Sequence, residues 1–370
     1  MPLRSLVTQL RDTALTGELV DRAARSQRLL MRGAGRCSRG LVASALARRS
    51  GTPLLVVVPT LEEAGRWTAL LELMGWDTAS LYPTSEGSPY EPFDPTSEII
   101  WGQLQVLSDL LSDSQTTGQA IVATERCLQP HLPPPEALKR TSRTLREGDE
   151  VALEQLGETL AQLGYERVST IEQEGTWSRR GDIVDIFPVS SELPVRLEFF
   201  DEELDKLREF DPSTQRSLDP IDALRLPPTG FSPLIADQLR DTMPEGLERL
   251  LGEQDTELLL EGGTPEGMRR LMGLAWQTPA SLLDYLPPET TVVIDERRHG
   301  KAHGQQWLDH VEDHHREMAT EAGLSDAERD SLWPAVLHRS IEAAYELAEA
   351  FDGFDMAELL EEDNHPNSFD

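Results

Sequence analysis

The run "LLVVV", Leu54–Val58, constrains the fold of this chain more than any other stretch. A strand that is apolar at every position has both faces buried, which is typical of a strand inside a parallel sheet. Helical patterns follow at residues 60–74 and 97–111, and strands that alternate with helices predict an α/β fold with a parallel sheet. The other strand signals lie at residues 29–31, 79–82 and 119–124.

The pattern changes at residue 138. Leu153, Leu156, Leu160 and Leu163 have the spacing of one helix face. Short strand signals then follow one another closely, which predicts an antiparallel meander and therefore a small inserted α+β domain. These signals cover residues 168–174, 177–187, 194–200 and 206–211.

We therefore expect four parts. Residues 1–137 and 229–345 form the two segments of the α/β domain, and 138–228 form the insertion. The second segment is mostly helical, with strands expected near residues 257–260 and 291–294. Residues 346–370 are acidic, lack a helix cap and read as a linker, so we expect the chain to be a fragment of a longer protein.

The charge of the chain disfavours one class of function. There are 66 acidic residues against 34 Lys and Arg, a net charge of −32. Such a chain is a poor stand-alone DNA binder, because phosphate contacts require basic clusters. The two cysteines form no disulfide framework, so we expect a reducing cytoplasm. No stretch approaches 18 apolar residues, so we expect no membrane span.

The stretch "MRGAGRCSRGLVASALARR" resembles a phosphate-binding loop that opens a helix after a strand. Gly33 takes the place of the first glycine of the motif, but Ser38 takes the place of the second. Arg39 replaces the lysine that contacts phosphate, and Gly40 replaces the Ser or Thr that binds Mg²⁺. We predict a retained backbone that has lost its ligand. ATP binding through Arg39 is the alternative.

Two other motifs are weaker. "TVVIDE" has the Walker B form, an apolar strand followed by Asp295 and Glu296, although any buried strand before acidic residues looks similar. Together with the altered loop it suggests one nucleotide-binding ancestor interrupted by the insertion. His310 and His314 have metal-capable i,i+4 spacing, but the acid is misplaced for known zinc patterns. We therefore predict a solvated helix face and no metal site.

The strand "PVRLEFF" has two unlike faces. Alternation puts Val195, Leu197 and Phe199 on a core face, and Arg196, Glu198 and Phe200 on the other. Aromatic residues and Arg are enriched in interface hot spots, so the second face is a candidate protein-binding surface. Arg179 and Arg180, in the preceding "WSRRGDIVDIFP", would lie on a partner strand. The alternative is that Phe200 packs under a nearby helix.

The long stretch "GTWSRRGDIVDIFPVSSELPVRLEFFDEELDKLREFDPSTQRSL" resembles the second domain of the bacterial transcription-repair coupling factors, the Mfd family. It is also similar to the UvrA-binding domain of UvrB. The flanking "YPTSEGSPYEPFDPTSEIIWGQL" and "SLLDYLPPETTVVIDE" extend the resemblance to about residues 20–300. It implies a degenerate RecA-like P-loop domain in two segments, with a UvrA-binding α+β domain inserted.

The resemblance also implies roles for particular residues. In the family, UvrA recruitment depends on an Arg before the Gly of one strand, here Arg180, and on an Arg that opens the next strand, here Arg196. It also depends on an aromatic residue that closes that strand, here Phe200. Glu198 lies between the last two, and we expect it to orient them.

The implied function is a non-catalytic docking module that recruits UvrA in nucleotide excision repair. The ATP- and Mg²⁺-dependent motor, the contacts with double-stranded DNA and the RNA polymerase-binding part would lie beyond residue 370. The loop around Tyr90 and Phe93 is too short for the DNA-clamping hairpin of UvrB. Two alternatives remain: a reduced helicase that binds ATP through Arg39 and Asp295, and a UvrB paralogue that acts directly on DNA.

Overall fold

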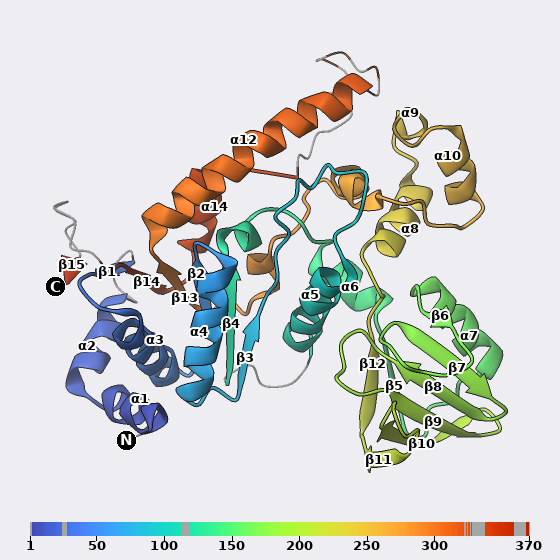
Figure 1. Ribbon diagram of the computed structural model, residues 1–370, viewed down its shortest axis with the longest axis horizontal. Helices are drawn as coiled ribbons and strands as arrows, with labels where there is room; N and C mark the ends of the chain where they lie inside the picture. The colour runs from blue at the N-terminus through green and yellow to red at the C-terminus, as the bar shows by residue number, and fades with distance from the viewer. Residues whose placement is uncertain are drawn as a thin grey trace.

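The computed structural model describes residues 2–23, 28–112, 118–321, 323, 325, 327, 337–358 and 368–369. Three parts are visible in Figure 1: a domain built on a parallel sheet, an antiparallel domain at the lower right, and a lobe of short helices above it. The long helix α12 (Arg297–Glu321) runs across the top of the sheet domain.

The parallel sheet is assembled from both segments of the chain, as predicted. Its order is β15-β1-β14-β13-β2-β4-β3, and every neighbouring pair is parallel. Its strands are β1 (Leu29–Met31), β2 (Leu54–Val58), β3 (Thr78–Leu81), β4 (Gln119–Thr124), β13 (Thr291–Asp295), β14 (Gly353–Met356) and β15 (Ser368–Phe369).

Each face of this sheet has its own apolar core, which confirms the reading of Leu54–Val58. Leu55 and Val57 of β2 pack into one core, and Val56 packs into the other. One core is covered by α1 (Leu3–Arg11), α2 (Ala14–Ala23), α3 (Arg36–Ser50) and α4 (Leu61–Leu73). The other is covered by α5 (Ser97–Leu110), η1 (Glu125–Leu128), α6 (Pro135–Thr141), η3 (Leu282–Tyr285), α12 and α14 (Ile341–Ala348). Its apolar cluster continues into the lobe of short helices (Figure 1), which contains α8 (Ser232–Thr242), α9 (Leu247–Leu251), α10 (Glu253–Leu260), η2 (Met268–Leu271) and α11 (Met272–Ala275).

The inserted domain is an antiparallel meander with one helix, as predicted. Its sheet has the order β11-β10-β9-β8-β7-β6, and only the short β6 runs parallel to its neighbour. The strand expected at residues 177–187 is a hairpin, because Gly181 adopts φ 66° and starts a two-residue turn. The elements are β5 (Arg143–Arg146), α7 (Leu153–Gln162), β6 (Glu166–Arg167), β7 (Thr176–Arg180), β8 (Ile183–Phe187), β9 (Val195–Phe200), β10 (Glu203–Phe210), β11 (Ser217–Pro220) and β12 (Ala223–Leu226).

The two ends of the insertion are joined at its base. Strands β5 and β12 form a separate two-stranded antiparallel sheet. On β12, Arg225 donates hydrogen bonds to the carbonyls of Ser108 and Leu111 at the end of α5. Trp101 of the same helix donates to the Thr229 carbonyl at 3.0 Å. The C-terminal end of the insertion is thus attached to α5 at two points, Arg225 and Thr229.

Two expectations are wrong. Residues 257–260, read as a strand, belong to helix α10, which begins after Gly252. The expected linker at 346–370 begins inside α14 and contains β14, which lies between β1 and β13 in the sheet. Gly353 permits this close pairing, since a Cβ there would collide with the backbone of Val292. No signal in the sequence predicts β14, because the strand has only 4 residues and lies in an acidic segment.

Glu125 generates a prediction about pH. It is 3% exposed, and neither of its carboxylate oxygens has a hydrogen-bond partner among the described residues. Burial raises its pKa from 4.5 to about 7. The folded state therefore retains a proton that the unfolded chain releases, so stability is lost as pH rises from 4.5 to 7.

We expect Glu125→Gln to abolish that loss, which is on the order of 3 kcal/mol. Chemical denaturation at pH 5 and pH 8 would measure it, with the exposed Glu136→Gln as the matched control. An identical pH dependence for wild type and Glu125→Gln would contradict the assignment.

Candidate functional site

The altered phosphate loop has the predicted strand–loop–helix form. It leaves β1, turns at Gly33 with φ 77°, and enters α3 after Gly35. Ser38, Arg39 and Gly40 are all inside α3. The Walker B-like strand β13 ends at Asp295 on the same carboxyl edge of the sheet, with only β14 between it and β1. The structure therefore brings the two motifs together.

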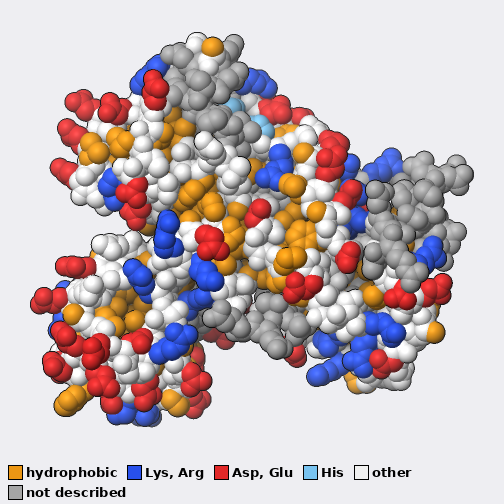
Figure 2. Space-filling view, turned by 180° about the vertical axis from the view of Figure 1, so that it is seen from behind, with side chains coloured by type: hydrophobic (Ala, Val, Ile, Leu, Met, Phe, Trp, Pro, Cys, Tyr) orange, Lys and Arg blue, Asp and Glu red, His pale blue; other side chains and the backbone are white. Residues whose placement is uncertain are grey.

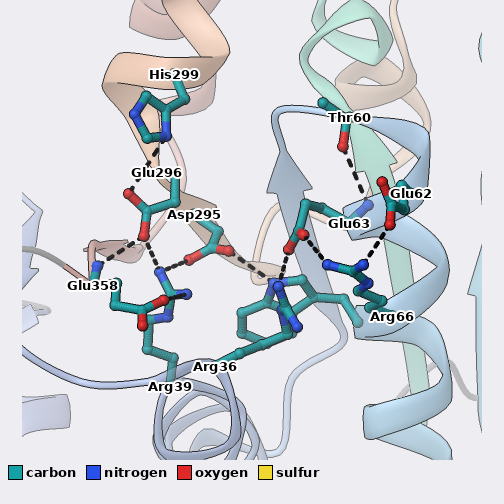
Figure 3. A network of polar contacts seen from close by, with 11 residues as sticks. Arg36, Arg39, Thr60, Glu62, Glu63, Arg66, Asp295, Glu296, His299 and Glu358 are labelled. Atoms are coloured by element: carbon teal, nitrogen blue, oxygen red, sulfur yellow. Dashed lines mark hydrogen bonds and ion pairs between the residues drawn. The ribbon is translucent and has the colours of Figure 1, made fainter.

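Arg39 fills the space between the two motifs (Figure 3). Its side chain is 2% exposed, and its Nη1 lies 2.7 Å from Asp295 Oδ1. The same nitrogen donates a hydrogen bond to Glu296, and Nη2 lies 3.6 Å from Glu358. An internal guanidinium thus holds the carboxylate that would bind Mg²⁺ in an intact site.

The carboxylates around Arg39 are fixed by further contacts. Trp67 of α4 donates to Asp295 Oδ2 at 2.8 Å. Glu296 has φ 50°, an unusual conformation for a residue with a side chain, and its carboxylate accepts the Glu358 amide at 2.7 Å. Burial raises the pKa of Asp295 to about 6, although Arg39 opposes this shift. The cluster therefore depends on Arg39 for its charge balance.

Gly40 has a packing role. It is buried in α3, and a Cβ at this position would lie 3.0 Å from both Leu70 of α4 and Met74, the residue that caps α4. The two helices are therefore close together where a Ser or Thr would have to bind metal. Ser38, the third altered position, is exposed. Each of the three positions now lacks the chemistry of a phosphate loop.

The exposed sheet face of the inserted domain is the second site. On β9, Val195, Leu197 and Phe199 are buried, which confirms the predicted core face. Phe200 is 79% exposed. The alternative that Phe200 packs under a helix is therefore wrong.

Arg196 lies on the predicted face, where it is bound by Asp185, its partner on the neighbouring strand β8. Its Nε and Nη2 donate to the two oxygens of Asp185 at 2.7 and 2.9 Å. Its guanidinium also lies over the Phe210 ring, 4.8 Å from the centroid. Asp185 is 2% exposed, so Asp185 rather than Glu198 orients this arginine. The hydrogen bonds to Asp185 raise the pKa of Arg196.

The strand register places the remaining predicted residues beside one another. Arg180 of β7 pairs with Ile183 of β8, and Ile183 pairs with Glu198 of β9. The turn after β7 also touches β9, since the Phe199 amide donates to the Asp182 carbonyl at 2.9 Å. We call Arg180, Ile183, Arg196, Glu198 and Phe200 the outer face.

Sequence reasoning missed Ile183, which is 38% exposed in the middle of the outer face. The signal was present in "DIVDIF", where alternation separates Ile183 from the buried Val184 and Ile186. A prediction of one continuous strand over 177–187 obscures this alternation, because the hairpin turn at Gly181 starts a new strand at Ile183.

For His310 and His314 the sequence predicts a solvated helix face and no metal site. The rings of His310 and His314 are 6.0 Å apart on α12. The described residues contain no group of three His, Cys, Asp or Glu that could hold a metal ion. Within the same residues, no helix is long and apolar enough to cross a membrane.

Comparison with known proteins supports the resemblance. Residues 144–230 match the family model described as the UvrB interaction domain, nearly the span of the insertion. The transcription-repair-coupling factor of Bacillus subtilis (strain 168) is 29% identical over 289 residues, 72% of this chain. That of Mycobacterium tuberculosis (strain CDC 1551 / Oshkosh) is 32% identical over 311 residues, 76% of this chain. The chain is a relative of the transcription-repair-coupling factors.

The match covers only part of those relatives. It spans 24% of the Bacillus subtilis protein and 25% of the Mycobacterium tuberculosis protein. The Escherichia coli (strain K12) protein, at 29% identity, is likewise covered over 24% of its length. This chain therefore corresponds to about a quarter of a transcription-repair-coupling factor.

The contacts of Arg39 generate a stability prediction. Arg39→Met leaves Asp295 and Glu296 together without their cation, and loss of one partner from a buried ion pair costs roughly 3 kcal/mol or more. Chemical denaturation should show this loss, and Asp295→Asn in the same chain should recover part of it. The matched control is Arg36→Met on the same helix, because its half-buried pair with Glu63 contributes about 1 kcal/mol or less. Equal effects of the two single substitutions would refute the role given to Arg39.

Proposed function

We propose that this chain is the UvrB-like docking module of a transcription-repair coupling factor and that its outer face binds UvrA. By this proposal the module recruits UvrA to RNA polymerase stalled at a lesion, imitating the face by which UvrB meets UvrA. The motor, the polymerase-binding part and the principal DNA contacts belong to the longer protein. We expect that protein to act in the cytoplasm.

Phe200 is the observation that carries this proposal. A phenylalanine side chain that is 79% exposed, beside the half-buried Arg196 and Glu198 and the exposed Ile183, is poorly explained by folding. Exposed aromatic and arginine side chains that lie together are typical of protein-binding hot spots. The match to the family model described as the UvrB interaction domain supports UvrA as the partner that we propose for this surface.

The bidentate pair with Asp185 supports a preorganised role for Arg196. A guanidinium held by two hydrogen bonds loses little rotamer freedom on binding, which lowers the entropic cost of association. Figure 2 shows Asp and Glu side chains crowding the outer end of the inserted domain, at the lower left. Such a surface favours a protein partner over a DNA backbone.

We also infer that the sheet domain is a degenerate RecA-like domain and that its nucleotide site is lost. Arg39 and Asp295, the two groups that the reduced-helicase alternative requires, are bound to each other. The alternative of direct action on DNA lacks its aromatic hairpin. Tyr90 is 1% exposed and its hydroxyl accepts the Leu337 amide, so of the two aromatic residues Tyr90 and Phe93 only Phe93 is exposed.

Binding to UvrA can be tested with substitutions that spare the fold. We expect Phe200→Ala to weaken binding by about 2 kcal/mol, roughly thirtyfold, and Ile183→Ala to weaken it less, as measured by calorimetric titration of this chain with UvrA. Leu218→Ala is the matched control, because Leu218 is an exposed apolar side chain on β11, outside the outer face.

Arg196→Ala is a poor probe, because it also leaves Asp185 buried without its partner. Arg196→Lys keeps the charge and is preferable, with unfolding measured alongside. Failure of the wild-type chain to bind UvrA, or equal binding by Phe200→Ala, would refute the docking proposal.

Loss of the nucleotide site predicts that ATP with Mg²⁺ leaves the melting temperature unchanged, since only a bound ligand stabilises the folded state. Thermal denaturation with and without nucleotide measures this. A rise in melting temperature that Asp295→Asn abolishes would favour the reduced helicase.

A further inference from the structure

A pocket outside the carboxyl ends of β3 and β4 has no role in the proposed function. It is open to solvent, and its non-protein space, counted with the solvent at its mouth, is about 550 Å³. Thr84 and Ser85, which follow β3, and Arg126, which follows β4, contribute to its wall. In α/β sheets, ligands bind outside the carboxyl ends of the strands.

Arg269 contributes an unpaired guanidinium to this pocket. Among the described residues it has no hydrogen-bond or ion-pair partner, and its Nη1 is buried. Burial lowers its pKa, and the carboxylate of Asp94 acts on it only from beyond ion-pair distance. A buried guanidinium without an acceptor is unfavourable unless another molecule supplies one.

Two more buried side chains in the wall have unused hydrogen-bonding atoms. Arg126 is 7% exposed, and its Nε has no partner although Nη1 pairs with Glu86. Gln103 is fully buried; its amide nitrogen donates to the Pro83 carbonyl at 2.9 Å, while its Oε1 accepts nothing. The pocket therefore offers guanidinium donors and one amide acceptor.

The remaining wall is largely apolar. Glu91 also lines the pocket, but its carboxylate accepts the Ser88 amide at 3.3 Å. His131 is neutral, because burial lowers its pKa to about 3. The rings of Phe93 and Trp307 complete the wall. Arg126 is already paired with Glu86, so the group that favours an anion is Arg269, which has no carboxylate at ion-pair distance among the described residues, and the rings favour an apolar body.

The loop that forms this wall is held firmly. Trp307 of α12 donates to the Gly87 carbonyl at 3.2 Å, and Ser232 of α8 donates to Asp94 at 2.5 Å. Gly267 lies so close to Pro92 that a Cβ there would collide with its carbonyl. The pocket is thus formed before any ligand arrives.

We propose that this pocket binds a small organic anion. Its phosphate or carboxylate group contacts Arg269 and Arg126, and its apolar or aromatic body lies against Phe93 and Trp307. A hydroxyl or N–H group of the ligand donates to Gln103 Oε1. A small molecule fits better than a nucleic acid strand, because the net charge of −32 repels a polyanion.

The probes are phenyl phosphate and benzoate, with neutral benzyl alcohol as the matched control. We expect saturable calorimetric binding of at least one anion, weakened about tenfold or more by Arg269→Met. Arg270→Met, a neighbouring arginine outside the pocket wall, should leave binding unchanged. Bound anion should also change the fluorescence of wild type but not of Trp307→Phe.

If Arg269 only stabilised the fold, Arg269→Met would lower the melting temperature of the chain without ligand. By our proposal, Arg269→Met melts at the wild-type temperature or above it, because an unpaired buried charge is removed. The anion should raise the melting temperature of wild type only.

Three results would overturn the proposal: no saturable binding of either anion up to ~10 mM, equal affinity for benzyl alcohol, or unchanged affinity in Arg269→Met. Binding of a short single-stranded oligonucleotide that requires Arg269, without binding of either small anion, would assign the pocket to nucleic acid instead.

Discussion

The buried contact of Arg39 with Asp295 is the interaction on which the sheet domain depends. It joins the helix after β1 to the end of β13, and through Glu296 and Glu358 it reaches the segment that follows β14. These pieces come from both sides of the inserted domain. In an intact phosphate loop, nucleotide and Mg²⁺ would bridge the same elements. Here the chain supplies its own cation, so the domain is closed without a ligand.

Because Arg39 joins segments from both sides of the insertion, the sheet domain can support the inserted domain without a bound ligand. The β5–β12 ladder and the hydrogen bonds of Arg225 fix the inserted domain to α5. One face of the meander packs into the core of the inserted domain, and part of the other face is exposed to solvent. The core of the inserted domain is complete without Phe200, so this side chain can stay exposed to solvent.

The same chemistry, a guanidinium among buried atoms, recurs with different consequences. Arg39 and Arg196 are each matched by a buried carboxylate, and their role is to hold shape. Arg269 has no such carboxylate within ion-pair distance among the described residues. An arginine without a carboxylate at ion-pair distance is where we propose a ligand, whereas a matched one holds the fold together.

Local patterns in the sequence determined the parallel sheet, the meander and the two faces of β9, because strand alternation and the burial of apolar runs are short-range properties. They also predict, from Ser38, Arg39 and Gly40, a phosphate loop that has lost its ligand. Only the tertiary structure decided what Arg39 does, that Asp185 holds Arg196, and that β14 belongs to the sheet. Arg39 contacts Glu296, 257 positions away, and Asp185 meets Arg196, 11 positions away, through the pairing of two strands. No local pattern records which group of another segment or strand a side chain will meet.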